Sequence, residues 1–343
     1  MKTATVLTAL VAALGATALP HTRSEEKGYS STTAVEAKPT SLTGPNGEPY
    51  IPGQFFDRFF MIIGENMDIW DVEAQAPFAN LWKQAPNGRI LANYYAITHP
   101  SQPNYFAHIA ATSYGWNSDS VVNITGADSF TIVDLLEEKG ISWAGYAEDY
   151  PITQGCYIPY APEYANGTQV PHSYVRKHFP FVSMESIYTN ETRCNNLYNA
   201  EMFWKHLKEN TLPQFVYFTP NLLNDGHDTN SSYFASYIQE TWSETFYYND
   251  YFNSRALNYI SLDESGNTTG FNTVPGDNNN HIYAALFGGA LSNRDTFDKY
   301  DFTRYNHSSI TATLEMNWWG STGLLGRNDT YAPYFAVPGA GTI

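Results

Sequence analysis

The chain has 343 residues, of which 43% are hydrophobic and 16% aromatic, so it is long enough to bury a substantial core. Its formal net charge of −16 at pH 7 makes nucleic acids and anionic membranes poor partners. The same acidity has two explanations that composition leaves open. It keeps the protein soluble, or it suits work at acid pH, where many carboxylates lose their charge.

The first 50 residues are expected to lie outside the folded part of the chain. Residues 1–18 have the basic start, the apolar run and the small-x-small motif of a secretory signal peptide. Residues 19–50 are rich in Ser, Thr, Glu, Lys, Pro and Gly, which is typical of a disordered leader. No later stretch reaches the roughly 18 apolar residues that a membrane span needs. The sequence therefore predicts a secreted or cell-wall protein with a single domain over residues 51–343.

Cysteine and asparagine usage fits this compartment. The chain has two cysteines, Cys156 and Cys194, and in a secreted protein we expect them to form a disulfide. Seven Asn-x-Ser/Thr motifs indicate N-glycosylation in surface loops. Their asparagines are Asn123, Asn166, Asn190, Asn230, Asn267, Asn306 and Asn328.

From residue 55 onward, strand-like and helix-like segments alternate without an internal repeat. The expected strands are mostly apolar runs at residues 59–63, 90–97, 141–147, 214–219, 257–262 and 282–287. The expected helices lie at residues 76–84, 106–111, 128–139, 200–209, 233–248 and 308–319, with N-caps at Asp128 and Ser308. The stretches 150–198 and 265–280 have the composition of loops. This alternation predicts an α/β fold with a mostly parallel central sheet and helices on both faces.

Polar side chains follow several of the expected strands. In sheets of this kind, ligands bind outside the carboxyl ends of the strands. The residues found there are Glu65 and Asn66, Ser101, Asp225 and His227, and Asp263 and Glu264. Carboxylate and amide oxygens suit a hard divalent cation, although solvated acidic turns have the same composition. Adjacent residues of a strand point to opposite faces, so Asp263 and Glu264 can share a metal only if the chain turns there.

Ser101 lies between two prolines, Pro100 and Pro103, just before a helical run. In that position it is either an ordinary helix N-cap or a nucleophile. A helix N-terminus offers free N–H groups and a partial positive charge, which suit a phosphate. The local sequence alone leaves both roles open.

The ordered set of motifs resembles the fungal secreted acid phosphatases of the phosphoesterase family. The motifs lie at residues 64–66, 98–105, 146–151, 177–181, 220–221, 224–229, 262–265 and 325–329. That family also holds bacterial acid phosphatases and phosphatidylcholine-type phospholipases C. The resemblance runs in order from about residue 55 to residue 335, and it implies a fold like that of alkaline phosphatase and arylsulfatase.

The resemblance also implies roles for individual residues. It implies Ser101 as the nucleophile, with His178 and His227 contacting phosphate or protonating the leaving group. The implied metal ligands are Glu65, Asn66, Ser101, Asp263 and Glu264, around one divalent ion such as Mg²⁺, Ca²⁺, Mn²⁺ or iron. The implied substrate-binding residues are Asn104, Asp225 and His99.

Two features depart from the family pattern. The bacterial relatives have two aspartates where this chain has Asp263 and Glu264, so the metal geometry is expected to differ. The strand at residues 257–262 is also more polar than the family pattern. Two further residues have open roles: Lys177 either draws phosphate in or is solvated, and His307 lies at the rim of the site or is structural. His108 is expected in the core.

The leading hypothesis is an acid phosphomonoesterase that hydrolyses small phosphate monoesters through a phosphoserine at Ser101. A phosphodiesterase or phospholipase C of the same family is the first alternative. A glycoside hydrolase with paired carboxylates is the second, and its activity would survive chelation and the Ser101→Ala substitution. A non-catalytic cell-wall glycoprotein is the third. No feature of the sequence indicates an oligomeric state.

Overall fold

A computed structural model describes residues 42–81, 87–158, 174–266, 280–291 and 298–337. It also describes the backbone of a short antiparallel pair, β5 (Tyr164–Ala165) and β6 (Thr168–Gln169). The expected signal peptide at residues 1–18 lies outside the described residues. Residues 42–50 were expected within the leader. They form a turn with a bridge between Thr43 and Pro49, and Ile51 behind it is hydrogen-bonded to Gln214.

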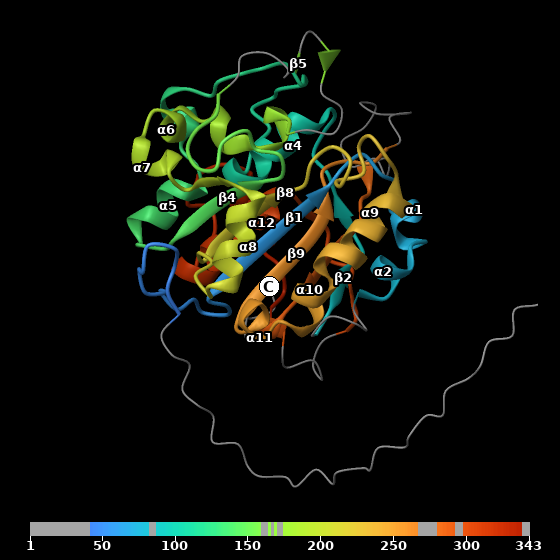
Figure 1. The fold of residues 1–343 in the computed structure, drawn as a ribbon. Coiled ribbons are helices and arrows are strands. Elements are labelled where there is room, and N and C mark those ends of the chain that lie inside the picture. The colour runs from blue at the N-terminus through green and yellow to red at the C-terminus, as the bar shows by residue number, and fades with distance from the viewer. Residues whose placement is uncertain are drawn as a thin grey trace, which may run out of the picture. The chain divides into compact units, whose positions relative to one another are not determined.

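An eight-stranded sheet forms the centre of the fold, in the order β11-β2-β10-β9-β1-β8-β4-β7 (Figure 1). Parallel pairs join β9 (Ala256–Leu262), β1 (Arg58–Gly64), β8 (Phe215–Thr219), β4 (Trp143–Ala147) and β7 (Leu197–Asn199). The strand β10 (Ala284–Phe287) is antiparallel to both β9 and β2 (Arg89–Leu91), and β11 (Tyr300–Asp301) is parallel to β2. The predicted mostly parallel sheet is confirmed.

Helices cover both faces of this sheet. Successive strand side chains alternate between faces, and in β1 Phe60 packs against Phe203 and Trp242 while Phe59 packs toward Phe56 and the opposite face. Phe56 in turn contacts Trp318 of α12 (Ser308–Trp319). One face carries α8 (Ala200–Lys208), α9 (Ser231–Tyr237) and α10 (Ser243–Tyr248), as Figure 1 shows. The segment η4 (Ile238–Trp242) joins α9 to α10. The other face carries α12 and α4 (Ser101–Ala110), which pack on each other.

Shorter elements complete the fold. The short α-helices are α1 (Ile69–Glu73), α2 (Ala76–Ala79), α5 (Ile132–Glu138), α6 (Glu185–Tyr188), α7 (Glu191–Cys194) and α11 (Asp250–Asn253). The 3-10 turns are η1 (Gly126–Ser129), η2 (Arg176–His178), η3 (Pro180–Ser183), η6 (Gly289–Leu291) and η8 (Asn328–Thr330). A two-stranded parallel pair joins β3 (Tyr94–Tyr95) and β12 (Tyr305–Asn306).

Several expected boundaries are wrong, each for a local reason. The run at residues 90–97 is two strands, because the chain turns at Ala92 and Asn93 and β3 leaves the main sheet to pair with β12. The helix expected from Asp128 begins after Thr131, whose hydroxyl accepts from Val133 N in a capping box. The N-cap of α12 is His307, one residue before the expected Ser308. The loop expected at 150–198 contains η2, η3, α6, α7 and β7.

The polar strand β9 lies in the middle of the sheet despite its composition. Its two polar side chains, Asn258 and Ser261, are fully buried. Asn258 Nδ2 donates to Asn253 Oδ1 at 3.0 Å, and Ser261 Oγ donates to the Tyr283 carbonyl at 2.8 Å. These bonds offset the cost of burying the Asn258 amide N–H and the Ser261 hydroxyl, whereas Asn258 Oδ1 has no hydrogen-bond partner among the described residues.

Cys156 and Cys194 form the expected disulfide. Among the seven sequon asparagines, Asn190 and Asn230 are exposed helix N-caps and Asn328 is exposed, whereas Asn123 is half-buried and Asn306 lies in β12 rather than in a loop. The side chains of Asn166 and Asn267 lie outside the described residues. In the part of the chain that the structure describes, no helix has the length and apolarity to cross a bilayer.

Candidate active site

Segments from distant parts of the chain meet at one edge of the sheet. Glu65 follows β1, Asp263 follows β9 and Asp225 lies in the loop after β8. Because β9, β1 and β8 are parallel neighbours, their carboxyl ends lie together. Ser101 begins α4 beside them, and His178 ends η2.

The Ser101 hydroxyl faces oxygens rather than the helix. Pro100 is the N-cap of α4 and makes no side-chain cap hydrogen bond, and Ser101 is the first helical residue, so the interpretation of Ser101 as the N-cap is wrong by one residue. The side chain is buried, with 1% of the residue exposed. Around Ser101 Oγ lie Glu65 Oε2 at 3.2 Å, Glu264 Oε1 at 3.4 Å and Asn66 Oδ1 at 3.5 Å. One hydroxyl proton can serve only one of these oxygens, so the arrangement suits a cation among them.

Two turns bring adjacent side chains into the same site. Asn66 has a φ of 47°, in the left-handed region that Asn tolerates better than most residues, so the chain turns directly after Glu65. After β9, Asp263 Oδ1 accepts from Asn66 N at 3.1 Å and from Glu264 N at 2.6 Å. Asp263 and Glu264 therefore lie in one site although they are neighbours in sequence. Among the described residues, the buried Asp263 Oδ2 has no hydrogen-bond partner.

Glu264 is also held from the α4 side. His99 Nδ1 lies 2.8 Å from Glu264 Oε2, and Asn104 Nδ2 donates to the same oxygen at 3.3 Å. The other contacts of the Asn104 side chain fix the loop before α4: its Oδ1 accepts from Ile97 N and Thr98 N, and its Nδ2 donates to the Thr98 carbonyl. In this structure Asn104 therefore shapes the Ser101 turn.

A buried chain of rings holds the Asp263 carbonyl. His307 Nε2 lies 2.6 Å from Asp263 O and must carry a proton, because a carbonyl only accepts. His307 Nδ1 then accepts from His108 Nε2 at 3.2 Å, and His108 Nδ1 accepts from the Tyr217 hydroxyl at 2.8 Å. Burial lowers the pKa of His307 to about 4 and that of His108 well below its usual range, consistent with two neutral rings.

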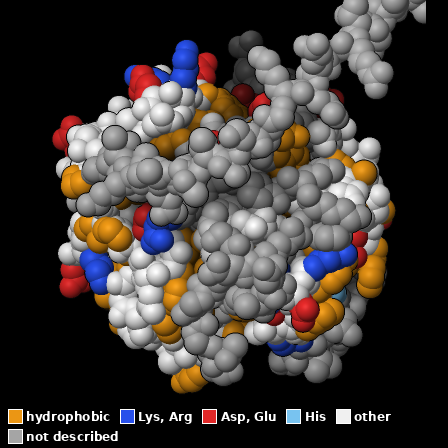
Figure 2. All heavy atoms as spheres, turned by 90° about the horizontal axis from the view of Figure 1, so that it is seen from below, with side chains coloured by type: hydrophobic (Ala, Val, Ile, Leu, Met, Phe, Trp, Pro, Cys, Tyr) orange, Lys and Arg blue, Asp and Glu red, His pale blue; other side chains and the backbone are white. Residues whose placement is uncertain are grey.

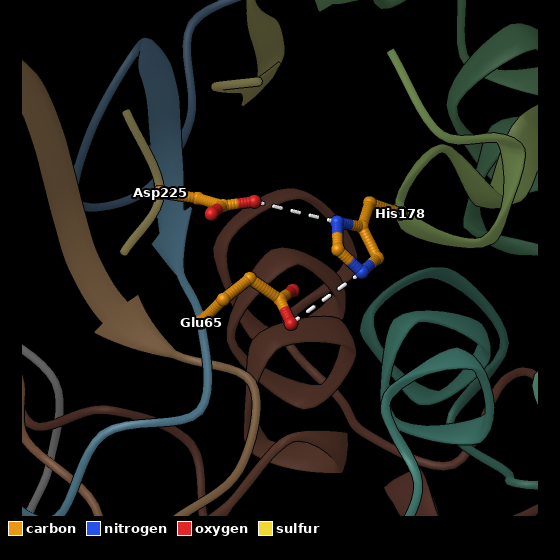
Figure 3. Close-up of side chains that lie close together, drawn as sticks. All are labelled: Glu65, His178 and Asp225. Atoms are coloured by element: carbon orange, nitrogen blue, oxygen red, sulfur yellow. Dashed lines mark ion pairs between the residues drawn. The ribbon is translucent and has the colours of Figure 1, made fainter. Parts of the chain in front are cut away.

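Glu65, His178 and Asp225 form a second buried group, which shares Glu65 with the first (Figure 3). His178 Nε2 lies 3.4 Å from Glu65 Oε2, and His178 Nδ1 lies 3.4 Å from Asp225 Oδ2. The ring stacks on Tyr105 at 4.9 Å, and the Tyr105 hydroxyl donates to Glu65. One ligand atom from each of the three residues lies within 4.8 Å of the others, so this group could hold a metal ion.

Burial dominates the electrostatics of the site. It raises the pKa of Glu65 well above the usual range, with a further rise from the charge of Asp263. Burial and the neighbouring Glu264 raise the pKa of Asp263 to about 7, and burial with Asp119 raises that of Glu264 to about 8. Burial also raises the pKa of Asp225. Several buried carboxylates close together favour a divalent cation, because its charge neutralises theirs. The residues present therefore fit a metal ion.

His227 lies at the half-buried side of the site. Its backbone N donates to Asp225 Oδ1 at 2.8 Å, and its Nδ1 lies 2.8 Å from Asp228 Oδ1. Its ring centre is 6.0 Å from that of His178. The structure thus brings every expected metal ligand, both expected catalytic histidines and all three expected substrate-binding residues to one edge of the sheet.

One residue near Ser101 went unnoticed in the sequence. Asp119 lies in a loop without a recognisable motif, and its carboxylate bridges Gln102 N at 3.0 Å and Lys177 Nζ at 2.8 Å. Lys177 begins the motif at residues 177–181, and the sequence leaves its role open. Only the tertiary structure brings Asp119 to the start of α4.

Two features define the class of protein. One is the α/β fold with its mostly parallel sheet, and the other is a serine surrounded by buried carboxylate and amide oxygens at the carboxyl ends of the strands. The chain matches the Phosphoesterase family over residues 53–319 and belongs to that family. It is 36% identical to the phosphate-repressible acid phosphatase of Penicillium chrysogenum, over 84% of this chain and 67% of that protein. It is 33% identical to an acid phosphatase of Aspergillus fumigatus, over 84% of this chain and 60% of that protein. The chain therefore spans 60 to 67% of the length of these two relatives.

Solved structures align with the chain more distantly. A protein in the alkaline phosphatase superfamily from Vibrio parahaemolyticus aligns with a TM-score of 0.48 and 15% identity, over 86% of this chain and 75% of that chain. The fold class of this chain rests on its own sheet, whose strand order and directions are given above.

Proposed function

We propose that this chain is a secreted acid phosphomonoesterase that hydrolyses small phosphate monoesters through a phosphoserine at Ser101. The observation that carries the proposal is the Ser101 hydroxyl, which is buried with three potential metal-ligand oxygens within 3.5 Å. Membership of the Phosphoesterase family and likeness to fungal proteins named acid phosphatases support it. The signal-peptide features of residues 1–18 support secretion.

The proposed cofactor is one divalent metal ion at the oxygen-rich set. The buried Asp263 Oδ2, which has no hydrogen-bond partner among the described residues, supports this position. The proposed ligands are Glu65, Asn66, Ser101, Asp263 and Glu264. Hard oxygen ligands favour Mg²⁺, Ca²⁺, Mn²⁺ or iron. The group of Glu65, His178 and Asp225 is the alternative position, since Glu65 belongs to both sets. When bound, such an ion stabilises negative charge on phosphoryl oxygens as a Lewis acid.

In the proposed reaction, Ser101 Oγ attacks phosphorus and the bond between phosphorus and the leaving alcohol breaks. The hydroxyl proton passes to a carboxylate, and Glu65 Oε2 is the nearest at 3.2 Å. Water then attacks the phosphoserine, which releases phosphate and restores the hydroxyl. The positive end of the α4 dipole stabilises the charge that develops on the phosphate.

His227 is the proposed acid for the leaving alcohol. Its side chain is 28% exposed, so a leaving group that departs toward solvent can reach it. The Asp228 carboxylate, 2.8 Å from Nδ1, stabilises the imidazolium that donates the proton. His178 is fully buried between two carboxylates, which supports a role in holding the site together or in binding metal.

The test is hydrolysis of p-nitrophenyl phosphate and bis-p-nitrophenyl phosphate at pH 5 by the wild type and Ser101→Ala. Ser236→Ala on exposed α9 is a matched control. We expect the wild type to prefer the monoester, Ser101→Ala to lose turnover and Ser236→Ala to keep it. Preference for the diester would indicate the phosphodiesterase branch. Glycosidase activity that survives both chelation and Ser101→Ala would overturn the proposal.

A further inference from the structure

Asp119 places a carboxylate at the start of α4, on the backbone N–H of the residue after Ser101. Its Oδ1 accepts from Gln102 N at 3.0 Å, and its Oδ2 lies 2.8 Å from Lys177 Nζ. Gln102 directly follows Ser101, and its N–H is one of the first four of α4, which have no partner within the helix. A carboxylate, an ammonium group and a helix N–H therefore meet one residue away from the proposed nucleophile.

The surrounding loop holds this arrangement on both sides of Asp119. Gln102 Nε2 donates to the carbonyls of Ser118 and Ser120, at 3.0 and 2.8 Å. The side chains of Lys177 and Asp119 are only 20% and 33% exposed. The ion pair is thus a partly buried contact between two fixed segments, and its energy is screened less by water than that of a surface pair.

The pair acts electrostatically on the carboxylates of the site. The charge of Lys177 favours the ionised forms of Glu65, Asp225 and Glu264, whereas the charge of Asp119 opposes ionisation of Glu264. Lys177 therefore acts on the site through its charge, although its ammonium group contacts the Asp119 carboxylate. An ammonium group and a free helix N–H are also the donors that bind phosphate oxygens elsewhere in proteins.

We propose that Lys177 and the Gln102 N–H bind the phosphate of the substrate, and that Asp119 occupies these donors as an internal anion until phosphate replaces it. The inference rests on the proposed function and adds two residues to its site. Each Asp119 oxygen faces one of the two donors, as two phosphate oxygens would.

The proposal predicts opposite effects on cation and anion binding. Lys177 repels a metal ion at the neighbouring carboxylates and attracts phosphate. The Lys177→Met variant should therefore bind Mn²⁺ more tightly and phosphate more weakly. Asp119→Asn removes the competing anion and one negative charge, so it should bind phosphate more tightly and Mn²⁺ more weakly. General damage to the site would weaken the binding of both ions.

The experiment is calorimetric titration at pH 5, with Mn²⁺ into metal-free protein and inorganic phosphate into Mn²⁺-loaded protein. We expect about a tenfold higher phosphate Kd in Lys177→Met, which corresponds to about 1.4 kcal/mol, and a lower one in Asp119→Asn. Lys177→Arg keeps the charge and should stay close to the wild type. Lys208→Met and Glu138→Gln make the same charge changes at exposed helix positions and should alter neither Kd.

Three outcomes would overturn the inference. Weaker phosphate binding in Asp119→Asn would mean that Asp119 supports Lys177 and does not compete with phosphate. An unchanged phosphate Kd in Lys177→Met, or no phosphate binding by the wild type, would exclude Lys177 as a phosphate-binding residue. Titration needs no turnover, so an inactive wild type that binds phosphate as described would contradict the proposed function and leave this inference standing.

Discussion

At the scale of single residues, the Ser101 hydroxyl has more acceptors than it can serve. The oxygens of Glu65, Asn66 and Glu264 surround it, and only one can accept its proton. When Glu65 and Glu264 are ionised, the remaining contacts bring oxygen atoms together without a proton between them. A cation removes this conflict, which is the physical basis for the proposed metal.

Removal of metal should therefore abolish turnover and lower stability. We expect chelation with EDTA to stop p-nitrophenyl phosphate hydrolysis, and a divalent ion at about 100 times its Kd to restore about 2.7 kcal/mol of unfolding free energy. Thermal unfolding and activity measured on the same chelated and reloaded samples check this. Full activity and an unchanged Tm after verified metal removal would contradict the metal site.

His307 should be important for stability although it touches no substrate. His307→Leu leaves the Asp263 carbonyl and His108 Nε2 without their partner, and each buried orphan costs about 1–3 kcal/mol. His307→Gln retains a donor for the carbonyl and should lose less. Urea unfolding of both variants measures the difference, and equal stability of His307→Leu and the wild type would refute the role of the ring.

At the scale of elements, the segment after α12 anchors the far end of α4. Arg327 donates to the Ala110 carbonyl at 3.1 Å, and Asn328 N donates to the Ala111 carbonyl at 3.3 Å. Asp329 shapes this segment by accepting from Leu325 N and Arg327 N. The motif at residues 325–329 thus holds α4, the helix that begins with Ser101. The motif itself lies outside the site.

Glu315 of α12 should make the fold more stable in acid. Burial raises its pKa to about 7, and its carboxyl group accepts from Leu324 N and Leu325 N beside the carboxyl of Asp329. Because the folded-state pKa lies above the unfolded value of about 4.3, the folded protein binds the extra proton between these limits. The unfolding free energy should therefore rise as pH falls from 8 to 5. This gain is lost when pH rises through the folded-state pKa of about 7.

The Glu315→Gln variant tests this, because an amide cannot titrate. Between pH 5 and 8, the unfolding free energy of this variant should change less than that of the wild type, by an amount on the order of 1 kcal/mol. Chemical unfolding at several pH values measures the slope. The same slope in both proteins would show that other groups cause the pH dependence.

The disulfide should stabilise the segment between β4 and β7. Cys156 and Cys194 are 38 residues apart, and closing a loop of that length is worth about 3–4 kcal/mol in the chain-entropy model. Cys156→Ser with Cys194→Ser should lower the unfolding free energy by up to that amount. If the double variant unfolds at the same urea concentration as the oxidised wild type, this account of the disulfide is wrong.

At the scale of the whole molecule, one face shows how the charged side chains are distributed. The face that Figure 2 shows, away from the carboxyl ends of the strands, has acidic and basic side chains scattered among hydrophobic ones. The described atoms on this face form no large patch of one charge. A net charge of −16 is therefore consistent with both explanations offered by the sequence, and Glu315 adds a specific group that favours acid conditions.

The sequence predicted those features of the fold that follow from general rules. Continuous apolar strands that alternate with helices require a mostly parallel sheet, and the ends of neighbouring parallel strands must meet. Glu65, Asp225 and Asp263 could therefore be grouped before the structure was known. The resemblance to the family supplied the role of Ser101 as nucleophile, and it supplied His178, which follows no expected strand.

The remaining features depend on contacts that no local pattern encodes. Asp119 reaches the site from a loop without a motif, and the His108–His307 contact joins α4 to the start of α12. The turn that brings Asp263 and Glu264 together depends on hydrogen bonds to Asn66 N and Glu264 N. The split of the strand at residues 90–97 depends on its pairing with β12, which is more than 200 positions away in sequence.

The most direct test of the central claim is trapping of the covalent intermediate. The wild type would be mixed with excess p-nitrophenyl phosphate at pH 5, quenched in acid within milliseconds and digested for mass spectrometry. We predict phosphate on Ser101 in the wild type, none in Ser101→Ala, and at least about a thousandfold loss of turnover in that variant. Phosphate on a histidine, or rapid turnover by Ser101→Ala, would contradict the account.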